Sequence, residues 1–241
     1  MSVTITAADI NKLRQTTGAG MLDCRKALTE SNGDFEAAID WLRKQGQKVA
    51  AKRSDREAKE GVVIAQTTAD HKSGIVLCIS CETDFVSKNA DFVAFAQSIA
   101  DAAIANDVKT AEELNGVTVN GAKVEELIND KLAAIGEKIA VSKFERVDAP
   151  YVASYIHGAN RMGVLVSMTK EAAEEGKDVA MQIATMNPLA VDETSISQET
   201  KDREKAIAIE MIKAEGKPAE MAEKIADGKM NKFFKDNTLM H

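Results

Sequence analysis

The sequence contains little cysteine, proline or aromatic residue. Its 241 residues include three cysteines, three prolines and one tryptophan. Three cysteines in a chain of this length do not build a disulfide framework, which agrees with a reducing compartment. No apolar run approaches the roughly 18 residues that suggest a membrane span, and the N-terminus lacks the layout of a secretory signal. We therefore expect a cytoplasmic protein without membrane contact.

Basic residues are fewer than acidic residues, 31 against 38. The net charge is −7, so phosphate backbones should repel the chain as a whole. The one basic run, Arg43 to Lys59, is interleaved with Asp55 and Glu57, which favours a solvated helix or linker. Direct nucleic-acid binding is not expected. A ribosome- or RNA-associated translation protein that uses this run is kept as the alternative function.

Residues that could support catalysis are few and scattered. Cys78 and Cys81 form a CxxC motif, but strand residues three apart face opposite sides of a sheet, so no metal site is expected. A small thiol enzyme built on this pair remains the enzymatic alternative. The three histidines lie far apart, and TGAG at 17–20 lacks the Lys-Ser or Lys-Thr of a phosphate-binding loop. It is more simply a turn between helices.

Residues 5–46 predict a compact three-helix unit. Thr6 can cap the first helix, with Asp9 in a capping-box position. TTGAG and SNGD separate the helices, Asp34 caps the third, and Gly46 is expected to end it. A unit this small has too little volume to enclose a catalytic pocket, so we expect it to bind another protein.

A repeat follows. Each copy is predicted to be a β-hairpin followed by a helix, which indicates an α+β core of paired antiparallel sheets with helices on one side. The segments are 61–68, 74–82 and 91–105 in the first copy, and 151–158, 163–170 and 178–186 in the second. Between the copies, the pattern predicts a helix near 124–135 and a weakly alternating linking strand at 139–148. Two antiparallel helices are predicted at 200–215 and 219–227, either protruding towards a partner or folded onto the core.

Phe85 occupies an unusual place. It falls in the polar connection between the predicted strand 74–82 and the helix 91–105. A phenyl ring in a loop more often folds back onto the core than faces a partner. The equivalent connection of the second copy, EAAEEGK, has no aromatic residue, which favours a functional role and predicts that the Phe85 side chain is exposed.

A set of motifs in one order resembles the bacterial elongation factor Ts family and covers most of the chain. They are TTGAGMLDCRKAL (16–28), GDFEAAIDWLRKQG (33–46), TDFV (83–86), YIHG (155–158), GVLV (163–166), AMQIATMNP (180–188) and EGKPAEMAEKIADGKMNKF (215–233). The resemblance implies a ubiquitin-associated-like three-helix domain at 1–54, core N- and C-subdomains at 55–148 and 149–190, and a helical hairpin or coiled coil at 191–228. The family continues beyond the motif at the end of this sequence, so 229–241 is expected to be a truncated return segment.

The same resemblance implies the activity: guanine nucleotide exchange on the GTPase elongation factor Tu, in its GDP-bound and nucleotide-free states. It implies no enzyme, no cofactor and no direct nucleotide binding. Thr83, Asp84, Phe85 and Val86 would disturb the magnesium site of the GTPase. Gly18, Gly20 and Met21 would contact the same GTPase domain, and His157 would face the third domain of the GTPase.

Overall fold

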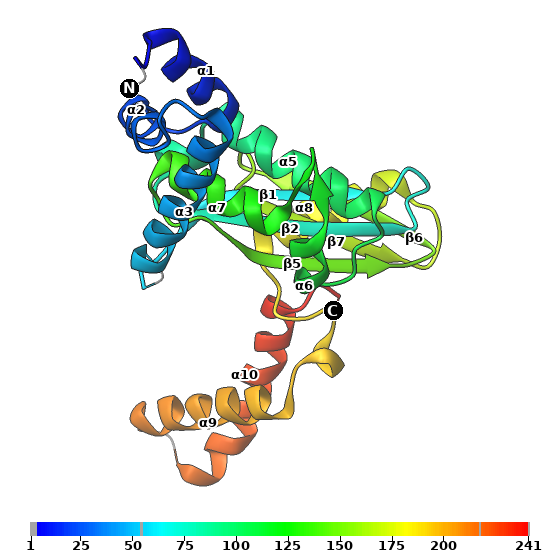
Figure 1. The fold of residues 1–241 in the computed structure, drawn as a ribbon. Coiled ribbons are helices and arrows are strands. Elements are labelled where there is room, and N and C mark those ends of the chain that lie inside the picture. The colour runs from blue at the N-terminus through cyan, green and yellow to red at the C-terminus, as the bar shows by residue number, and fades with distance from the viewer. Residues whose placement is uncertain (1–3, 54, 217, 241) are drawn as a thin grey trace. The chain divides into compact units, whose positions relative to one another are not determined.

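The computed structural model describes residues 4–53, 55–216 and 218–240. The chain combines runs of helices with small antiparallel sheets, which confirms the predicted α+β class (Figure 1). The chain divides into two compact units, Met1–Lys177 and Asp178–His241. Within the described ranges, no helix combines the length and the apolar character needed to cross a membrane.

The chain begins with three helices: α1 (Ala7–Thr17), α2 (Met21–Glu30) and α3 (Phe35–Arg53). The predicted capping box is present at α1, where the Asp9 N–H donates to Thr6 Oγ1 (3.2 Å) and the Thr6 N–H donates to Asp9 Oδ2 (3.0 Å). Leu13, Cys24, Ala27, Leu28 and Ala38 form the small buried core of these helices.

The prediction that Gly46 ends the third helix is wrong. Helix α3 continues through Gly46 to Arg53 and packs against α7 (Val124–Ile135). A Cβ atom at position 46 would lie only 2.7 Å from the Cβ of Ala133. The glycine therefore permits a close approach of two helices rather than a helix stop.

The central sheet has three antiparallel strands in the order β1-β2-β5: β1 (Glu60–Thr67), β2 (Ser73–Cys81) and β5 (Ala140–Asp148). The predicted linking strand at 139–148 is thus a full sheet member. It pairs with β2 from Ser73↔Asp148 to Ser80↔Ala140, with one irregularity at Cys78/Ile79. Backbone hydrogen bonds to β2 make β5 a member of the sheet. The alternation of side chains along 139–148 does not show which strand it pairs with.

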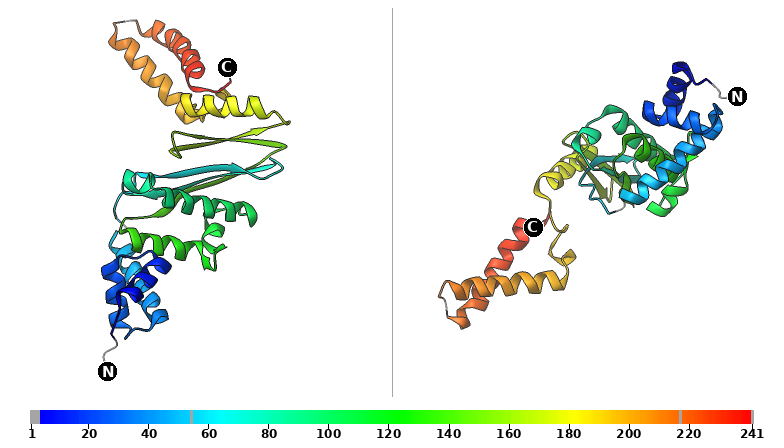
Figure 2. Two further views of the ribbon diagram at one scale, coloured as in Figure 1. Left: turned by 90° about the horizontal axis from the view of Figure 1, so that it is seen from above. Right: turned by 60° about the vertical axis from the view of Figure 1, so that its left-hand side comes forward.

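One face of this sheet carries the main core. Alternate residues of β2, including Ile75, Leu77 and Ile79, are fully buried beneath α5 (Ala90–Ala105). Phe92, Ala96, Ile99 and Ala103 form the buried face of α5. Figure 2 shows this helix lying along the sheet. The sequence places this hairpin and helix within one residue of their observed bounds.

A second sheet, of β6 (Tyr151–His157) and β7 (Met162–Met168), packs on the other face of the first (Figure 2). The contact is close, because a Cβ at Gly163 would lie 2.8 Å from Val63 Cγ1. The helix after β7 begins at Ala173, not at 178 as predicted. Its first turn lies on the outer side of β6–β7, where a Cβ at Gly176 would lie 2.7 Å from Ala153 Cβ. The first turn of this helix therefore covers part of the outer side of the second sheet.

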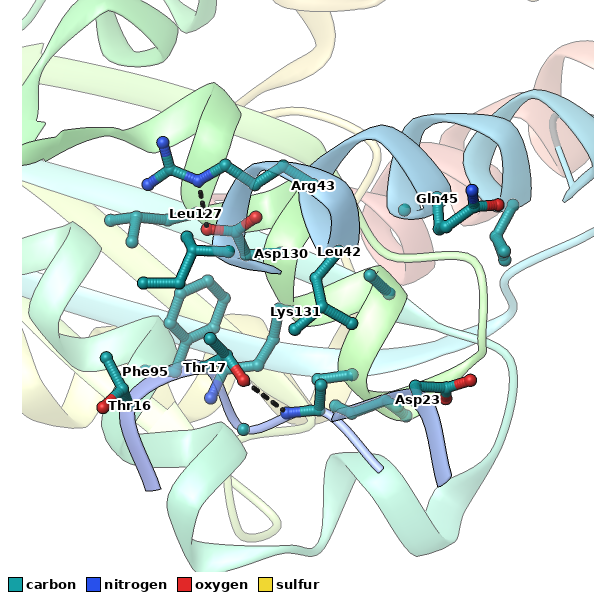
Figure 3. A pocket seen from close by; sticks show the side chains of 18 of the residues that line it. Thr16, Thr17, Asp23, Leu42, Arg43, Gln45, Phe95, Leu127, Asp130 and Lys131 are labelled. Atoms are coloured by element: carbon teal, nitrogen blue, oxygen red, sulfur yellow. Dashed lines mark hydrogen bonds and ion pairs between the residues drawn. The ribbon is translucent and has the colours of Figure 1, made fainter. Parts of the chain in front are cut away.

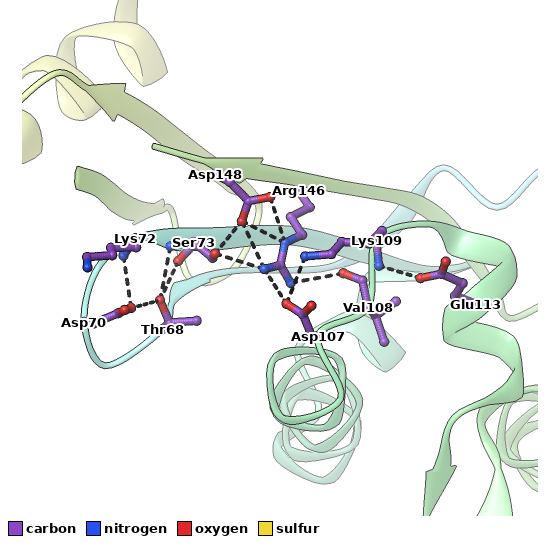
Figure 4. A network of polar contacts seen from close by, with 10 residues as sticks. All are labelled: Thr68, Asp70, Lys72, Ser73, Asp107, Val108, Lys109, Glu113, Arg146 and Asp148. Carbon is purple, nitrogen blue, oxygen red and sulfur yellow. Dashed lines mark hydrogen bonds and ion pairs between the residues drawn. The ribbon is translucent and has the colours of Figure 1, made fainter. Parts of the chain in front are cut away.

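Three short elements in the α5–β5 connection escaped prediction: α6 (Ala111–Gly116), β3 (Thr118–Val119) and β4 (Ala122–Lys123). The almost fully buried side chain of Arg146 ties this connection to the sheet (Figure 4). Its Nη2 lies 2.6 Å from Asp107 Oδ1 and 3.0 Å from Asp148 Oδ1. Burial opposes the charged form, but the hydrogen bonds and charges of Asp148 and Asp107 outweigh it and raise the pKa of Arg146.

The unit Asp178–His241 contains the remainder of α8 (Ala173–Met186), the short 3-10 helix η1 (Glu193–Ser195), α9 (Gln198–Ala214) and α10 (Ala219–Asn237). Helices α9 and α10 pack through Ala208, Ile212, Ala222 and Ala226, so the predicted helix pair is present. However, α10 extends ten residues beyond the predicted end at Asp227. The residues after it run beside 189–191, where the Met240 N–H donates to the Val191 carbonyl (2.7 Å).

Candidate protein-binding site

The predicted polar connection after β2 contains a short helix, α4 (Asp84–Ser87), with Thr83 at its N-cap. One turn of helix points successive side chains in different directions. Ser87 is buried and Val86 packs, partly buried, against the main core. Phe85 points away and is 85% exposed. The predicted exposure of Phe85 is therefore confirmed, and the ring is not part of the core.

Asp84 carries a negative charge beside this ring. Lys88 Nζ donates to Asp84 Oδ2 at 2.7 Å, and this hydrogen bond, with the charge of Lys88, lowers the pKa of the Asp84 carboxyl group. The charge of Arg161 lowers it further. Asp84 is therefore ionised at neutral pH.

The backbone before α4 contacts a distant carboxylate. Glu137 Oε2 accepts hydrogen bonds from the Glu82 N–H (3.1 Å) and the Thr83 N–H (3.0 Å), and Glu137 Oε1 accepts one from Thr83 Oγ1 (2.7 Å). No local sequence pattern indicated Glu137, because it lies more than fifty positions from its donors.

The turn between α1 and α2 forms the second predicted part of the site. Gly18 adopts φ +70°, a left-handed conformation that favours glycine, and ends α1 through a hydrogen bond to the Arg14 carbonyl (2.8 Å). Gly20 is the N-cap of α2. Met21 and Leu22, at the start of that helix, are 51% and 81% exposed. Neither residue belongs to the buried face of α2, which is formed by Cys24, Ala27 and Leu28. The sequence interpretation did not single out Leu22.

Residues of the turn and of α4 line one cavity of about 900 Å³. Figure 3 shows part of its lining, including Thr16 and Thr17 at the end of α1. Its lining includes Gly18 and Ala19 from the turn, Phe85 and Val86 from α4, and Ile135 from the end of α7. Ile135 is also partly exposed, and no local pattern distinguished it from the buried residues of its helix. Two segments more than sixty positions apart therefore contribute to one surface.

Charged side chains also line this cavity (Figure 3). Arg43 Nε lies 3.8 Å from Asp130 Oδ2, so this ion pair links α3 to α7. Burial raises the pKa of Asp130, and the charge of Arg43 opposes that rise. Lys131 Nζ lies 4.9 Å from the centre of the Phe95 ring.

His157 lies elsewhere, at the exposed end of β6. Its Nδ1 is 3.0 Å from the Tyr155 hydroxyl. The residues that line the cavity come from α1–α5 and α7 and the turns between them, so His157 belongs to a separate surface.

The cysteines offer little chemistry. Cys81 is fully buried beneath α5, whereas Cys78 lies on the other face of β2 and is partly exposed. Burial raises the pKa of the Cys81 thiol to about 11, so the thiol is protonated and a poor nucleophile at neutral pH. In the described part of the chain, no three potential ligand side chains lie close enough to hold a metal ion.

Comparisons with known proteins agree on one family. The family model described as "Elongation factor TS" matches residues 82–241. Elongation factor Ts of Christiangramia forsetii is 48% identical over 240 residues, covering 98% of this chain and 87% of the relative. Elongation factor Ts of Flavobacterium psychrophilum is 47% identical over 241 residues (99% and 87%), and that of Methylococcus capsulatus is 44% identical over 241 residues (99% and 82%). The chain therefore belongs to the elongation factor Ts family.

Proposed function

We propose that this protein is the guanine nucleotide exchange factor for elongation factor Tu. Family membership indicates the exchange activity. One structural observation indicates which residues contact the GTPase. An exposed phenyl ring, Phe85, stands on a short helix whose base is fixed by hydrogen bonds, beside the ionised Asp84. Exposed aromatic side chains on well-ordered elements are typical of protein interfaces.

Exchange by such a protein requires no chemical reaction of its own. A factor that binds the nucleotide-free GTPase better than its GDP form must weaken GDP binding by the same factor, because coupling free energy is reciprocal. Shifting a population from 1:99 to 99:1 takes roughly 5.5 kcal/mol of differential binding. The protein is thus a binding partner rather than an enzyme, and it holds neither cofactor nor nucleotide itself.

The magnesium ion of the GTPase is an effective target, since it neutralises the phosphates of the bound nucleotide. In this proposal, Phe85 inserts an apolar group near that ion, and Asp84 adds a negative charge. Thr83 fixes the start of the short helix, and Val86 anchors it to the main core. Gly18, Gly20 and Met21 dock on the same GTPase domain, and His157 contacts the third domain.

The domain scheme belongs to the same proposal. It comprises a ubiquitin-associated-like domain at 1–54, core subdomains at 55–148 and 149–190, a helical hairpin at 191–228 and a return segment at 229–241. A factor of translation elongation works where ribosomes work, so we place this protein in the cytoplasm.

The alternative, RNA binding through Arg43 to Lys59, is not favoured. Arg53 and Arg56 both contact the Glu82 carboxylate, at 2.8 and 3.0 Å. Arg43 pairs with Asp130. Phosphates would have to compete with these carboxylates, in a chain that is acidic overall.

The test is the release of fluorescently labelled GDP from purified elongation factor Tu. This protein should accelerate release in a saturable manner. Removing Mg²⁺ with a chelator accelerates release by itself, so the additional effect of this protein should become smaller when Mg²⁺ is absent. A folded protein that leaves the rate unchanged at high concentration would contradict the proposed function.

A further inference from the structure

Helix α4 cannot fix its own position. It has only four residues, and its N-cap residue Thr83 makes no side-chain capping hydrogen bond. One turn of helix is unstable in isolation, because forming it costs more conformational entropy than one hydrogen bond returns. Phe85 does little to anchor the helix, because its ring faces solvent and buries little apolar surface. The orientation of the ring therefore depends on contacts from outside the helix.

Glu137 provides contacts at the base of this helix. It lies between α7 and β5, is partly buried, and accepts three hydrogen bonds from Glu82 and Thr83, at 3.1, 3.0 and 2.7 Å. Hydrogen bonds to a carboxylate are stronger than those between neutral groups. The Glu137 carboxylate thus fixes the N-cap residue Thr83 and the residue before it, through their backbone N–H groups and the Thr83 hydroxyl, rather than capping the N–H groups of the first turn.

Glu82 makes the reverse contact. Glu82 Oε1 accepts from the Lys138 N–H (2.6 Å) and from Arg53 Nη1 (2.8 Å), and Glu82 Oε2 accepts from Arg56 Nη1 (3.0 Å). Segments 82–83 and 137–138 therefore each bind the backbone of the other. The contact lies just beyond Ser80↔Ala140, the last pair of the β2–β5 ladder, and continues the hydrogen bonding of the sheet to Thr83, the N-cap of α4.

We propose that Glu137 is a positioning residue for nucleotide exchange. Its carboxylate holds the start of α4 so that the Phe85 ring is presented in one orientation before the GTPase binds. This inference rests on the proposed function. Without the carboxylate, part of the binding free energy would be spent on ordering α4, and less would remain to distort the nucleotide site.

The experiment measures the maximal rate of GDP release from elongation factor Tu in a double-mutant cycle of Glu137→Ala and Phe85→Ala. Glu137→Ala alone should lower the maximal rate about tenfold, equivalent to about 1.4 kcal/mol of lost coupling. In the Phe85→Ala background the same substitution should change the rate less than about twofold, because its effect passes through the ring.

Two further variants separate positioning from general stability. Glu137→Gln keeps one oxygen that can accept from both N–H groups, while its amide can donate to Thr83 Oγ1, so roughly half of the wild-type rate should remain. Asp192→Ala removes a carboxylate that accepts from the Thr194 and Ser195 N–H groups at η1, and it should not change the rate.

Each outcome is decisive when the wild-type protein accelerates release, and an inactive wild-type protein would refute the proposed function instead. The positioning role would be overturned if Glu137→Ala released GDP at the wild-type rate. It would also be overturned if Glu137→Ala lowered the rate by the same factor with and without Phe85. A loss of rate in Glu137→Gln as large as that in Glu137→Ala would overturn it as well. Circular dichroism and thermal melting of each free variant establish that it is folded at the assay temperature.

Discussion

Gly46 of α3 lies directly against Ala133 of α7, so close that a methyl group on Gly46 would come within 2.7 Å of the Ala133 Cβ. Both contacting groups belong to helices, and neither can rotate away. The contact joins the N-terminal helices to the core and lies beside the cavity that Phe85 and Gly18 line. A glycine in a helix interior normally costs stability, so its presence here reflects packing.

Gly46→Ala should therefore destabilise the protein by about 1–3 kcal/mol, the usual cost of overpacking. Urea unfolding followed by the fluorescence of Trp41, the single tryptophan, measures it. Gly228→Ala in α10 is the matched control, since nothing lies within 4 Å of its added Cβ. That substitution should stabilise its helix by about 0.5–1 kcal/mol. Equal effects of the two substitutions would show that the close approach is unimportant.

Phe85→Ala should slow GDP release strongly while changing the free energy of unfolding by much less than the ~3–5 kcal/mol typical of a buried phenylalanine. Phe92→Ala, seven positions later and 2% exposed, should show that full loss of stability. Asp84→Ala should slow release in the same direction, and the pair should be less than additive because both residues act on one site. A Phe85→Ala protein with a much lower melting temperature and a normal exchange rate would reverse the assignment.

Met21 and Leu22 should contribute to docking rather than to exchange, because their turn lies apart from TDFV in sequence and offers apolar groups without charge. Substituting both with alanine should raise the concentration of this protein needed for half-maximal GDP release. The maximal rate should stay the same. Both side chains are exposed, so the melting temperature should hardly change. A lower maximal rate at unchanged half-maximal concentration would contradict this division of roles.

Glu82 predicts a pH dependence of stability. The hydrogen bond from the Lys138 N–H, followed by those from Arg56 and Arg53, lowers the pKa of Glu82 from 4.5 to about 2. A carboxyl group with a lowered pKa stabilises the folded state above its unfolded pKa, and this contribution disappears as the pH falls through the folded pKa. The stability difference between wild type and Glu82→Gln should thus be largest above pH 4.5 and shrink as the pH approaches 2. Urea unfolding over this pH range measures it, and a constant difference would refute the contact.

Several features follow from the sequence alone, because short-range patterns encode them. The alternation of apolar residues predicted the β1–β2 hairpin, and apolar residues at helical spacing predicted α5. Thr6 and Asp9 marked the start of α1. The exposure of Phe85 was also predictable. The connection of the second hairpin-plus-helix unit contains no aromatic residue, so the fold does not need one in its core at this place. For the hairpin, α5 and the start of α1, the deciding residues lie within about twenty positions of one another, where side-chain periodicity and capping act directly. The Phe85 inference instead compares two units of the repeat that lie far apart in the sequence.

Tertiary structure decided the rest. Gly46 is a helix stop by local rules, and only the position of Ala133, 87 residues away, makes it a packing residue. The weak alternation of 139–148 predicted a strand, but the pairing of this strand with β2 was decided only by the folded chain. Glu137 is one acidic residue among many until the fold brings it to Thr83. A hydrogen bond or a steric contact between distant segments leaves no periodic trace in either segment, so the folded chain alone reveals it.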